Sequence, residues 1–411
     1  MTKRQRLLAF MAVLALGCPL VAVAAREAAP QPSPAVEVRV RVTSGGRFLD
    51  DLSLADFGLL EDGQAQTLGS LALVQNGRIA RQEGIASVRV PPARSYTLLF
   101  QLVDWDPKLM EAVEYLFSSV VKPGDSLALV TPFKPYHLQR DALAQRTPEE
   151  LSKSMKDVLR KDVLRGNGEY RDLLAELRRL SRAIGGGSGA TQEDIDADPS
   201  TDAESGFGLE MQIDRYRAAL MKMEGIRLVD EKKLLAFAES LRPIAGQKTV
   251  VLFYQREFRP EISPTTMTRL MSLYQDNPDI LGNLMDLFQF YKREKTFDVN
   301  KVKKAFAAAG IDFHFIFMEK KNQRVFGATM REQSEDTYPG FVEIAKATGG
   351  TADSSSNPAK AFKHAADTSA TYYLLSYVPA GVEIGAAFRQ IDVSVKRAGC
   401  QVTNPLGYFT K

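Results

Sequence analysis

The sequence predicts an α/β protein with a mostly parallel central sheet flanked by helices, a small antiparallel β module formed by both chain ends, and a helical insertion. Three observations support this prediction: apolar runs alternate with helical patterns in the middle of the chain, alternating apolar and polar residues occur near both ends, and residues 147–245 are largely helical in pattern. Strands that alternate with helices favour a parallel sheet covered on both faces. Strict alternation is typical of a half-buried strand.

Residues 1–25 are expected to be a secretory signal peptide rather than part of the fold. Basic residues precede an almost unbroken apolar run that ends in the small-residue pattern Ala22-Val23-Ala24, which is the order of regions in a leader. Two alternatives remain open. One is lipidation at Cys18, and the other is an uncleaved membrane anchor, because the apolar run is long enough to span a bilayer. A cleaved signal peptide, a lipidated leader and an uncleaved anchor all predict that the rest of the chain lies outside the cytoplasm, in the periplasm, the cell envelope or the medium.

Composition and charge narrow the class of protein. The 411-residue chain has 53 Lys and Arg against 50 Asp and Glu, and removing the leader with Lys3, Arg4 and Arg6 leaves 50 against 50. No basic run with interleaved aromatic residues remains, so a nucleic-acid partner is disfavoured. Cys400 is the single cysteine beyond the leader. An internal disulfide is therefore excluded in the processed chain, and core packing must supply the stability.

The N-terminal part is expected to be a tether followed by the β module. Residues 26–35 are rich in Ala and Pro and form a linker. Residues 36–92 begin with the strictly alternating strand Val36–Val42, and turn residues such as Glu61-Asp62-Gly63 separate further short strands. This pattern predicts an antiparallel β module that carries no catalytic or ligand-binding site.

The central domain, residues 93–380, is expected to hold the parallel sheet. Its first strand, Tyr96–Val103, leads into a helix over residues 108–121, for which Asp106 and Pro107 are suitable N-cap and first-position residues. Helical patterns precede two of the later apolar runs. The other predicted sheet strands cover residues 126–133, 248–254 and 311–317, and the helices cover residues 234–241 and 299–309.

Additional helices interrupt this domain, and strands close the chain. The predicted insertion at 147–245 contains a flexible acidic loop at 185–207, and residues 263–297 add two or three further helices. Residues 372–378 are typical of a buried strand. The C-terminal strands within 381–411 are expected to join the N-terminal β module, because chain ends often lie close together.

Three segments carry a family resemblance. They read "DLSLADFGLLEDGQAQTLGSL" from residue 51, "FVEIAKATGGTADSSS" from residue 341 and "TYYLLSYVP" from residue 371. Together with Asp104 after the first central strand, they resemble the VWFA-related family of secreted bacterial proteins, which carry a von Willebrand factor A-type (VWA) domain. The resemblance covers roughly residues 36–133 and 234–411. It implies a VWA or Rossmann-like fold and adhesion or protein binding through a metal-ion-dependent site.

The resemblance also implies where a metal would bind, and this chain departs from the pattern. The family has Asp-x-Ser-x-Ser after the first strand, where this chain has Asp104, Asp106 and Lys108, and a later Asp is replaced by Gln255. Mg²⁺ prefers oxygen ligands, and a protonated lysine cannot supply one. We therefore expect a degenerate site with no cofactor, or at most a weak Mg²⁺ or Ca²⁺ at Asp104 and Asp106. In the metal-free interpretation, Asp106 caps the helix, and Asp104 pairs with Lys108 or Arg256.

Other motifs are weaker. Asp194, Asp196 and Asp198 begin like a calcium loop, but Pro199 stands where that loop needs glycine. His314 alternates within a predicted strand and is expected to be a core residue. Cys400 is expected to be a bystander rather than a catalytic thiol. No serine or cysteine occurs with a histidine and an acid in a pattern that supports nucleophilic catalysis.

The function predicted from these residues is non-enzymatic. The protein is expected to be an exported protein-binding or adhesion module with a degenerate metal site and an unidentified protein partner. It is expected to contact a membrane only through its leader, and only if that leader is uncleaved or lipidated. One alternative is a metal-independent scaffold whose helical insertion is the binding surface. A third is an enzyme of unrecognised type, which would need a pocket of titratable groups with mutually perturbed pKa values.

Overall fold

The computed structural model describes residues 35–84, 94–138, 141–185, 206–227, 229–292, 297–322, 328–379 and 387–410. The predicted leader, the linker up to residue 34 and residues 186–205 of the predicted acidic loop lie outside the described residues, and so do Asp194, Asp196 and Asp198. None of the helices in the described ranges combines the length and the apolar character needed to cross a bilayer.

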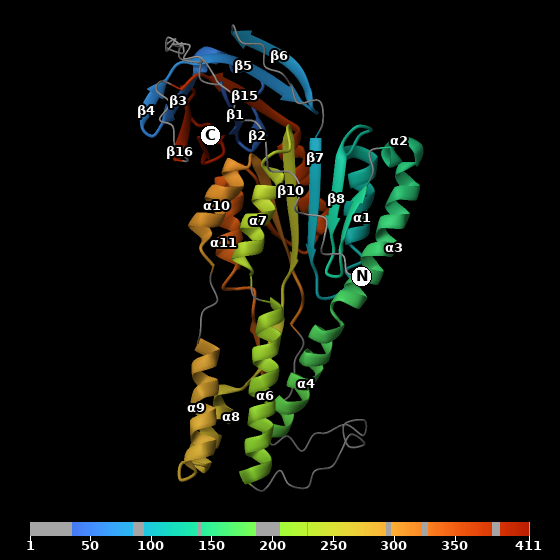
Figure 1. Ribbon diagram of the computed structural model, residues 1–411, viewed down its shortest axis with the longest axis vertical. Coiled ribbons are helices and arrows are strands. Elements are labelled where there is room, and N and C mark those ends of the chain that lie inside the picture. Colours follow the sequence, from blue (N-terminus) through green and yellow to red (C-terminus); the bar gives the residue numbers. More distant parts are fainter. Residues whose placement is uncertain are drawn as a thin grey trace, which may run out of the picture. The chain divides into compact units, whose positions relative to one another are not determined.

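One six-stranded sheet is partly parallel (Figure 1). Its order is β14-β12-β10-β7-β8-β9, and every neighbouring pair is parallel except β8 with β9. All residues of β10 and β12 are buried, as expected for strands covered on both faces. The strands are β7 (Arg94–Gln101), β8 (Ser126–Val130), β9 (Pro135–Leu138), β10 (Gln247–Gln255), β12 (Ile311–Met318) and β14 (Ala352–Ser355).

Helices cover this sheet on both faces. Phe100 and Phe253 pack with one set of helices, and Phe313 and Phe315 pack with the other. The first set is α1 (Leu109–Tyr115), α3 (Pro148–Gly166) and α12 (Pro358–Ala370), and the second is α7 (Glu231–Leu241), α10 (Val299–Ala308) and α11 (Tyr338–Ala347). The segment after α1 is a π-helical turn (Leu116–Val120), and α2 (Ala142–Gln145) is a short helix before α3.

Local sequence explains where several of these helices begin and end. Thr147 and Glu150 form a capping box at the start of α3, each side chain bonding to the other residue's backbone N–H at 3.2 Å. The same helix ends at Gly166, where a β-carbon would lie 2.5 Å from the carbonyl carbon of Pro132. Only glycine therefore allows α3 to approach the β8–β9 loop so closely. Gly349, with φ +79°, follows α11 in the left-handed region.

The other sheets are antiparallel. A second six-stranded sheet has the order β17-β1-β15-β5-β6, with β2 on β1, and a four-stranded sheet has the order β18-β16-β3-β4. The two sheets share one hydrophobic core. Their strands are β1 (Val36–Ser44), β2 (Arg47–Phe48), β3 (Phe57–Glu61), β4 (Gln64–Gln66), β5 (Leu68–Gln75), β6 (Arg78–Gly84), β15 (Thr371–Tyr377), β16 (Phe388–Val395), β17 (Gln401–Thr403) and β18 (Gly407–Phe409). A 3₁₀ turn (Leu54–Asp56) precedes β3.

The predicted fold class is wrong for this chain. The described residues form a mixed α/β fold with one partly parallel sheet and three antiparallel sheets, one of which has as many strands as the partly parallel sheet. Strand β15 shows why the prediction failed. Its apolar run falls in the range predicted for the central domain, but the strand lies between β1 and β5 in the antiparallel sheet. A continuous apolar run indicates burial on both faces, and burial does not fix strand direction.

Four helices form a separate packing unit, which we call the helical arm. They are α4 (Gly168–Ile184), α6 (Gly206–Arg227), α8 (Pro264–Leu273) and α9 (Pro278–Lys292), with the two-stranded sheet of β11 (Phe258–Ile262) and β13 (Ala328–Glu332) beside them. The arm has its own core, in which the Tyr291 hydroxyl lies 2.8 Å from that of Tyr216. The range predicted as an insertion is thus divided, because α3 and α7 pack on the parallel sheet while α4 and α6 belong to the arm.

Candidate functional site

Polar side chains gather where three parallel strands end. Asp104 follows β7, Gln255 ends β10, and Lys320 follows β12. In sheets with parallel strands, ligands bind beyond the carboxyl ends of the strands. We call Asp104, Gln255, Lys320 and the adjacent Glu257 and Arg227 the sheet-edge cluster.

Gln255 holds two strand ends together. Its Oε1 accepts hydrogen bonds from the backbone N–H groups of Val103 at 3.0 Å and Asp104 at 2.9 Å, and the residue is only 5% exposed. A carboxamide oxygen has two lone pairs, and both are used here. The oxygen of Gln255, a residue for which the sequence resemblance predicts a carboxylate position, is therefore fully used by backbone donors.

Asp104 pairs with a cation of the protein itself. Its carboxylate accepts a hydrogen bond from the Lys320 ammonium, and both side chains are partly exposed. The sequence interpretation named Lys108 or Arg256 as the partner. Instead, the Lys108 ammonium donates to the Ser356 carbonyl at 2.7 Å. The Arg256 guanidinium lies 3.2 Å from the Glu332 carboxylate and over the Phe317 ring.

Asp106 shapes the turn before α1. Its Oδ1 accepts a hydrogen bond from the Lys108 N–H at 2.9 Å, and its backbone oxygen accepts one from the Leu109 N–H at 3.1 Å. The turn satisfies backbone donors that would otherwise be free at a helix start. The helix itself begins at Leu109 with Lys108 at its N-cap position, so the predicted N-cap at Asp106 is wrong by two residues, and Asp106 instead stabilises the preceding turn.

A buried ion pair lies next to the edge. Glu257 is 1% exposed, and its Oε2 lies 3.1 Å from Nε of Arg227 at the end of α6. The Arg227 guanidinium carbon lies 4.1 Å from the centre of the Tyr170 ring. Burial raises the pKa of Glu257, while the positive charges of Arg227 and Lys320 lower it. This pair connects the arm helices α4 and α6 to the segment after β10.

The residues present do not fit a resident divalent cation. The side chains of Lys108 and Lys320 carry positive charge into the region where the family resemblance would put the metal, and Gln255 uses its oxygen for the backbone. Across the described ranges, no group of three His, Cys, Asp or Glu side chains is arranged to hold a metal. Lys320, Glu257 and Arg227 were not identified from the sequence. The sequence feature that could have indicated Lys320 as a site residue is its position just after a predicted strand of the parallel sheet.

Replacing Gln255 by methionine is expected to destabilise the protein by about 2 kcal/mol, because two backbone N–H groups lose their acceptor. Methionine matches the length of glutamine without a strong acceptor. Gln255→Glu is the matched control, since it keeps an oxygen in place and should lose less. Urea unfolding measures the difference, and equal stability of the methionine variant and the wild type would show that these bonds contribute nothing.

A groove lies beside the sheet edge, between α1 and α3. Its volume is about 520 Å³, and Trp105, Met110, Glu114, Ser152 and Lys156 are among the residues that line it. The lining mixes apolar side chains with both charge signs, so it does not define one ligand class. The salt bridge between Lys156 and Glu114 joins the two helices along this groove.

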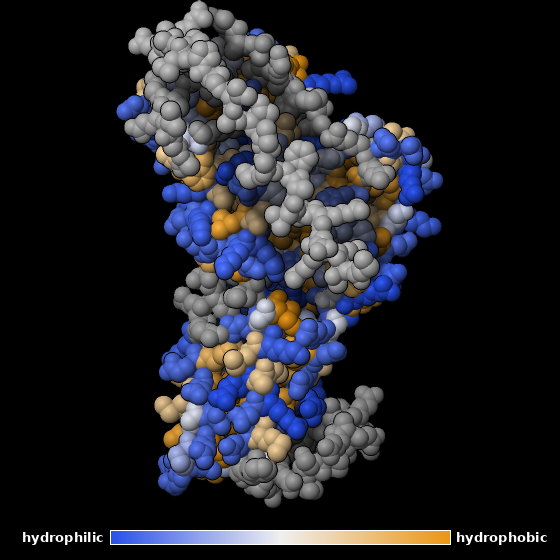
Figure 2. Space-filling view, viewed as in Figure 1, coloured by the Kyte–Doolittle hydropathy of each residue, from blue (hydrophilic) through white to orange (hydrophobic). Residues whose placement is uncertain are grey.

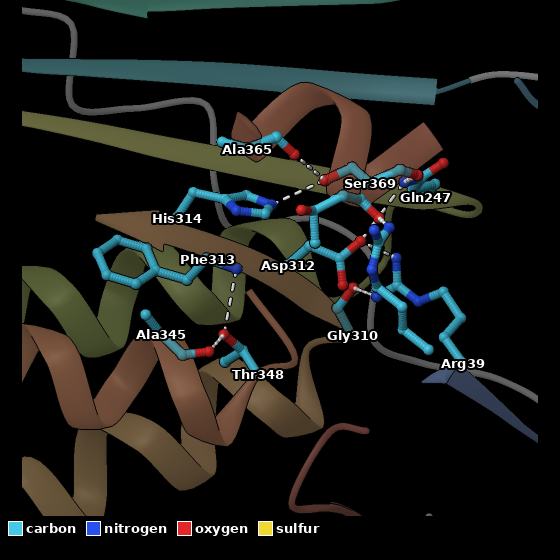
Figure 3. A network of polar contacts seen from close by, with 12 residues as sticks. Arg39, Gln247, Gly310, Asp312, Phe313, His314, Ala345, Thr348, Ala365 and Ser369 are labelled. Carbon is cyan, nitrogen blue, oxygen red and sulfur yellow. Dashed lines mark hydrogen bonds and ion pairs between the residues drawn. The ribbon is translucent and has the colours of Figure 1, made fainter. Parts of the chain in front are cut away.

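A polar network links the antiparallel module to the parallel sheet (Figure 3). Arg39 of β1 pairs with Asp312 of β12 and donates to the Gly310 carbonyl at 2.8 Å. The Gln247 amide donates to the Ser369 carbonyl at 2.8 Å. These bonds satisfy buried polar groups at the amino ends of β10 and β12.

His314, at the centre of this network, is held as a neutral ring. Its Nδ1 accepts the Thr351 N–H at 3.1 Å, so the proton lies on Nε2, which donates to Ser369 Oγ at 2.7 Å. Ser369 in turn donates to the Ala365 carbonyl at 3.1 Å. A histidine that donates to a serine cannot accept that serine's proton, so this pair does not activate a nucleophile. His314 is 1% exposed and lies in the core.

Acid is expected to destabilise the protein through His314. Burial lowers the pKa of His314 from 6.5 to about 3, so between these values the unfolded chain binds the proton and the folded chain does not. Stability therefore falls as the pH falls, by about 1.4 kcal/mol per pH unit at most. Asp312 acts in the opposite direction, because burial raises its pKa.

The measurement is urea unfolding at several pH values between 6.5 and 4. His314→Gln is expected to be less stable at neutral pH but to have a flatter dependence on pH than the wild type. If both proteins have the same slope, the buried histidine is not the source of the acid sensitivity. Asp312→Asn is the control for the opposing carboxyl group.

Comparisons with known proteins do not assign this chain to a family. A scan against models of protein families and a search of curated proteins find no match. Among solved structures, the human COPII-coat protein Sec24c is similar with a TM-score of 0.30 and 8% identity. The match covers 78% of this chain and 44% of that chain. A likeness this low carries no argument about fold or function.

Proposed function

We propose that this chain is an exported, non-enzymatic protein-binding module that binds its partner without a metal ion, through helix α9 of the arm. The single observation that carries the proposal is a second apolar face on α9. One face buries Ile280, Leu284 and Leu287 in the arm core, while Met285 and Phe288 are 55% and 42% exposed. Export rests on the predicted leader, and the resemblance to VWFA-related proteins remains a prediction.

Met285 and Phe288 continue an apolar stripe that begins at Leu281. Leu281, Met285 and Phe288 are spaced by four and three residues, which places them on one side of a helix. Leu281 is half-buried. We call these three residues the α9 stripe. A surface helix normally has one apolar face, and an additional exposed apolar face is typical of a binding surface.

The spacing of the α9 stripe and other exposed apolar side chains of the arm support an apolar, helical partner segment. Apolar patches lie among hydrophilic residues over the arm in Figure 2. Met221 of α6 and Leu273 of α8 are 60% and 70% exposed, and both helices contact the arm core that includes α9. The Lys292 ammonium lies 4.2 Å from the centre of the Phe288 ring, at the end of the stripe. Apolar anchors at helical spacing match a partner helix that presents the same spacing.

A metal-dependent alternative has less support. Asp104, Asp106 and Gln255 each bond to a partner within the protein. A partner that binds through a shared cation would need these oxygens. The proposed binding mode therefore uses the arm. Like the scaffold alternative drawn from the sequence it needs no metal, but that alternative placed the binding surface in residues 147–245, and α9 lies outside this range.

Site-specific photo-crosslinking tests the proposal. A benzophenone amino acid would replace Met285 on the arm, Met110 near the sheet edge, or Gln64 on the β module, in cells that produce the protein natively. All three positions are exposed, so reactivity alone does not distinguish them. We expect a discrete protein crosslink from position 285 alone. A discrete crosslink from position 110 and none from 285 would overturn the proposal.

A further inference from the structure

The groove between α1 and α3 has the length of a short chain-like ligand. The two helices lie side by side on one face of the parallel sheet (Figure 1). The volume of the groove is about 520 Å³, and its α3 wall extends from Pro148 to Arg160. This wall is about 18 Å of helix. Sites that bind small molecules in proteins have volumes of this order. The shape therefore suits a short linear molecule better than a compact one.

Charged side chains of both signs line the groove in equal number. Among the described residues, the acidic ones are Glu114, Glu149 and Asp157, and the basic ones are Lys153, Lys156 and Arg160. A charged ligand would therefore meet as many side chains of its own sign as of the opposite sign. A neutral ligand fits this lining better if its groups both donate and accept hydrogen bonds. The hydroxyl group is such a group.

Trp105 gives the groove an aromatic wall. The residue is half-buried, packs against the core under α1 and α3, and also lines the groove. The face of an aromatic ring carries partial negative charge, and C–H groups pack favourably against it. A sugar ring has C–H groups on its faces and hydroxyl groups around its edge. It can therefore contact the indole and the polar side chains of the groove at the same time.

Ser152 of α3 is the residue that most directly indicates a ligand. It lines the groove and is only 3% exposed, and its hydroxyl has no hydrogen-bond partner in the described part of the chain. A buried polar group without a partner lowers the stability of a protein. Such departures from good packing are expected mainly at functional sites. A ligand hydroxyl that enters beside Ser152 would supply the missing partner.

We propose that this groove binds a neutral oligosaccharide, with one sugar ring on the indole of Trp105 and one sugar hydroxyl hydrogen-bonded to Ser152. The mixed charges alone define no ligand class. The aromatic wall, the unpaired hydroxyl and the length of the groove together favour a sugar chain. The inference goes beyond the proposed function and does not depend on it, because the α9 stripe belongs to the helical arm and not to this groove.

Fluorescence titrations of the purified protein with maltotetraose, cellotetraose and chitotetraose test the inference. Trp105 is the single tryptophan of the chain, so its emission reports binding in the groove directly. We expect at least one tetrasaccharide to change the emission and to bind about ten times more tightly than its own disaccharide, because the longer chain contacts more of the groove. The zwitterionic dipeptide alanyl-phenylalanine is the control for a charged ligand and should bind more weakly than the tetrasaccharide.

Ser152→Ala separates a role in binding from a role in packing. The hydroxyl is unpaired in the free protein, so its removal should not lower the urea midpoint. It should weaken tetrasaccharide binding by about fivefold, because one hydrogen bond to the sugar is lost. Ser154→Ala is the matched control, since Ser154 is exposed on the same helix and is not among the residues that line the groove. This variant should bind the tetrasaccharide as tightly as the wild type.

Several results would overturn the inference. One is an unchanged emission with all three tetrasaccharides, and another is tighter binding of the dipeptide than of any tetrasaccharide. A disaccharide that binds as tightly as its tetrasaccharide would contradict a site for a sugar chain. A Ser152→Ala variant that binds the tetrasaccharide as tightly as the wild type would show that the unpaired hydroxyl does not contact the ligand.

Discussion

Replacing Arg227 by methionine is expected to destabilise the protein by about 3–5 kcal/mol, because it leaves the Glu257 carboxylate buried without its ion-pair partner. The Arg227 side chain is 9% exposed and that of Glu257 is 1% exposed, so water cannot replace the lost charge. Methionine retains apolar contact with the Tyr170 ring. Most of the loss therefore reports the unpaired charge rather than lost packing.

Urea unfolding measures this effect, with the midpoint compared at an unchanged m-value. The double variant Arg227→Met with Glu257→Gln removes both charges and should recover much of the stability. If the free energy of unfolding of Arg227→Met lies within about 1 kcal/mol of the wild-type value, the ion pair contributes no more than a surface pair does. That result would contradict a buried ion pair. Lack of recovery in the double variant would show that packing, rather than charge, explains the loss.

Placing lysines on the α9 stripe is expected to weaken partner binding by roughly 100-fold, since apolar anchors at the centre of an interface carry most of its energy. The variant combines Met285→Lys with Phe288→Lys. Both side chains are exposed, so the free energy of unfolding should change by less than about 0.5 kcal/mol per position. Isothermal titration calorimetry with the partner identified by crosslinking measures the Kd of each variant.

A matched control separates this surface from general apolar exposure. Val378, after β15, is 59% exposed, close to the 55% of Met285. Val378→Lys should leave the affinity unchanged. If Val378→Lys weakens partner binding as much as the α9 variant does, the α9 stripe is not a distinct binding surface. The same conclusion follows if the α9 variant is stable and binds the partner as tightly as the wild type.

Most strands and helices could be predicted from their residue patterns, but the pairing of the strands could not. The alternating segment 36–42 lies in β1, and the apolar runs 248–254 and 311–317 lie in β10 and β12. These patterns report which faces are buried. Strand direction depends on partners far away in the chain, and β15 pairs antiparallel with β1, more than 300 residues earlier.

The candidate site shows the same limit. Its place after a predicted strand singled out Asp104 in the sequence, and the family resemblance singled out Gln255, but neither signal predicted the partners of these residues. Lys320 lies 216 residues from Asp104, and Arg227 comes from an arm helix whose packing has no local sequence signal. Glu257, two residues after Gln255, could have been noted as a charged residue at the end of a buried strand.

The most direct test of metal-independent binding through the arm is the affinity of the crosslinked partner, measured by titration in Mg²⁺ and again in EDTA. The wild type and Asp104→Asn should give the same Kd in both solutions, and the α9 variant should bind weakly in both. Loss of binding in EDTA, or loss in the Asp104 variant with an intact α9 stripe, would contradict the proposed binding mode and place the interface at the sheet edge.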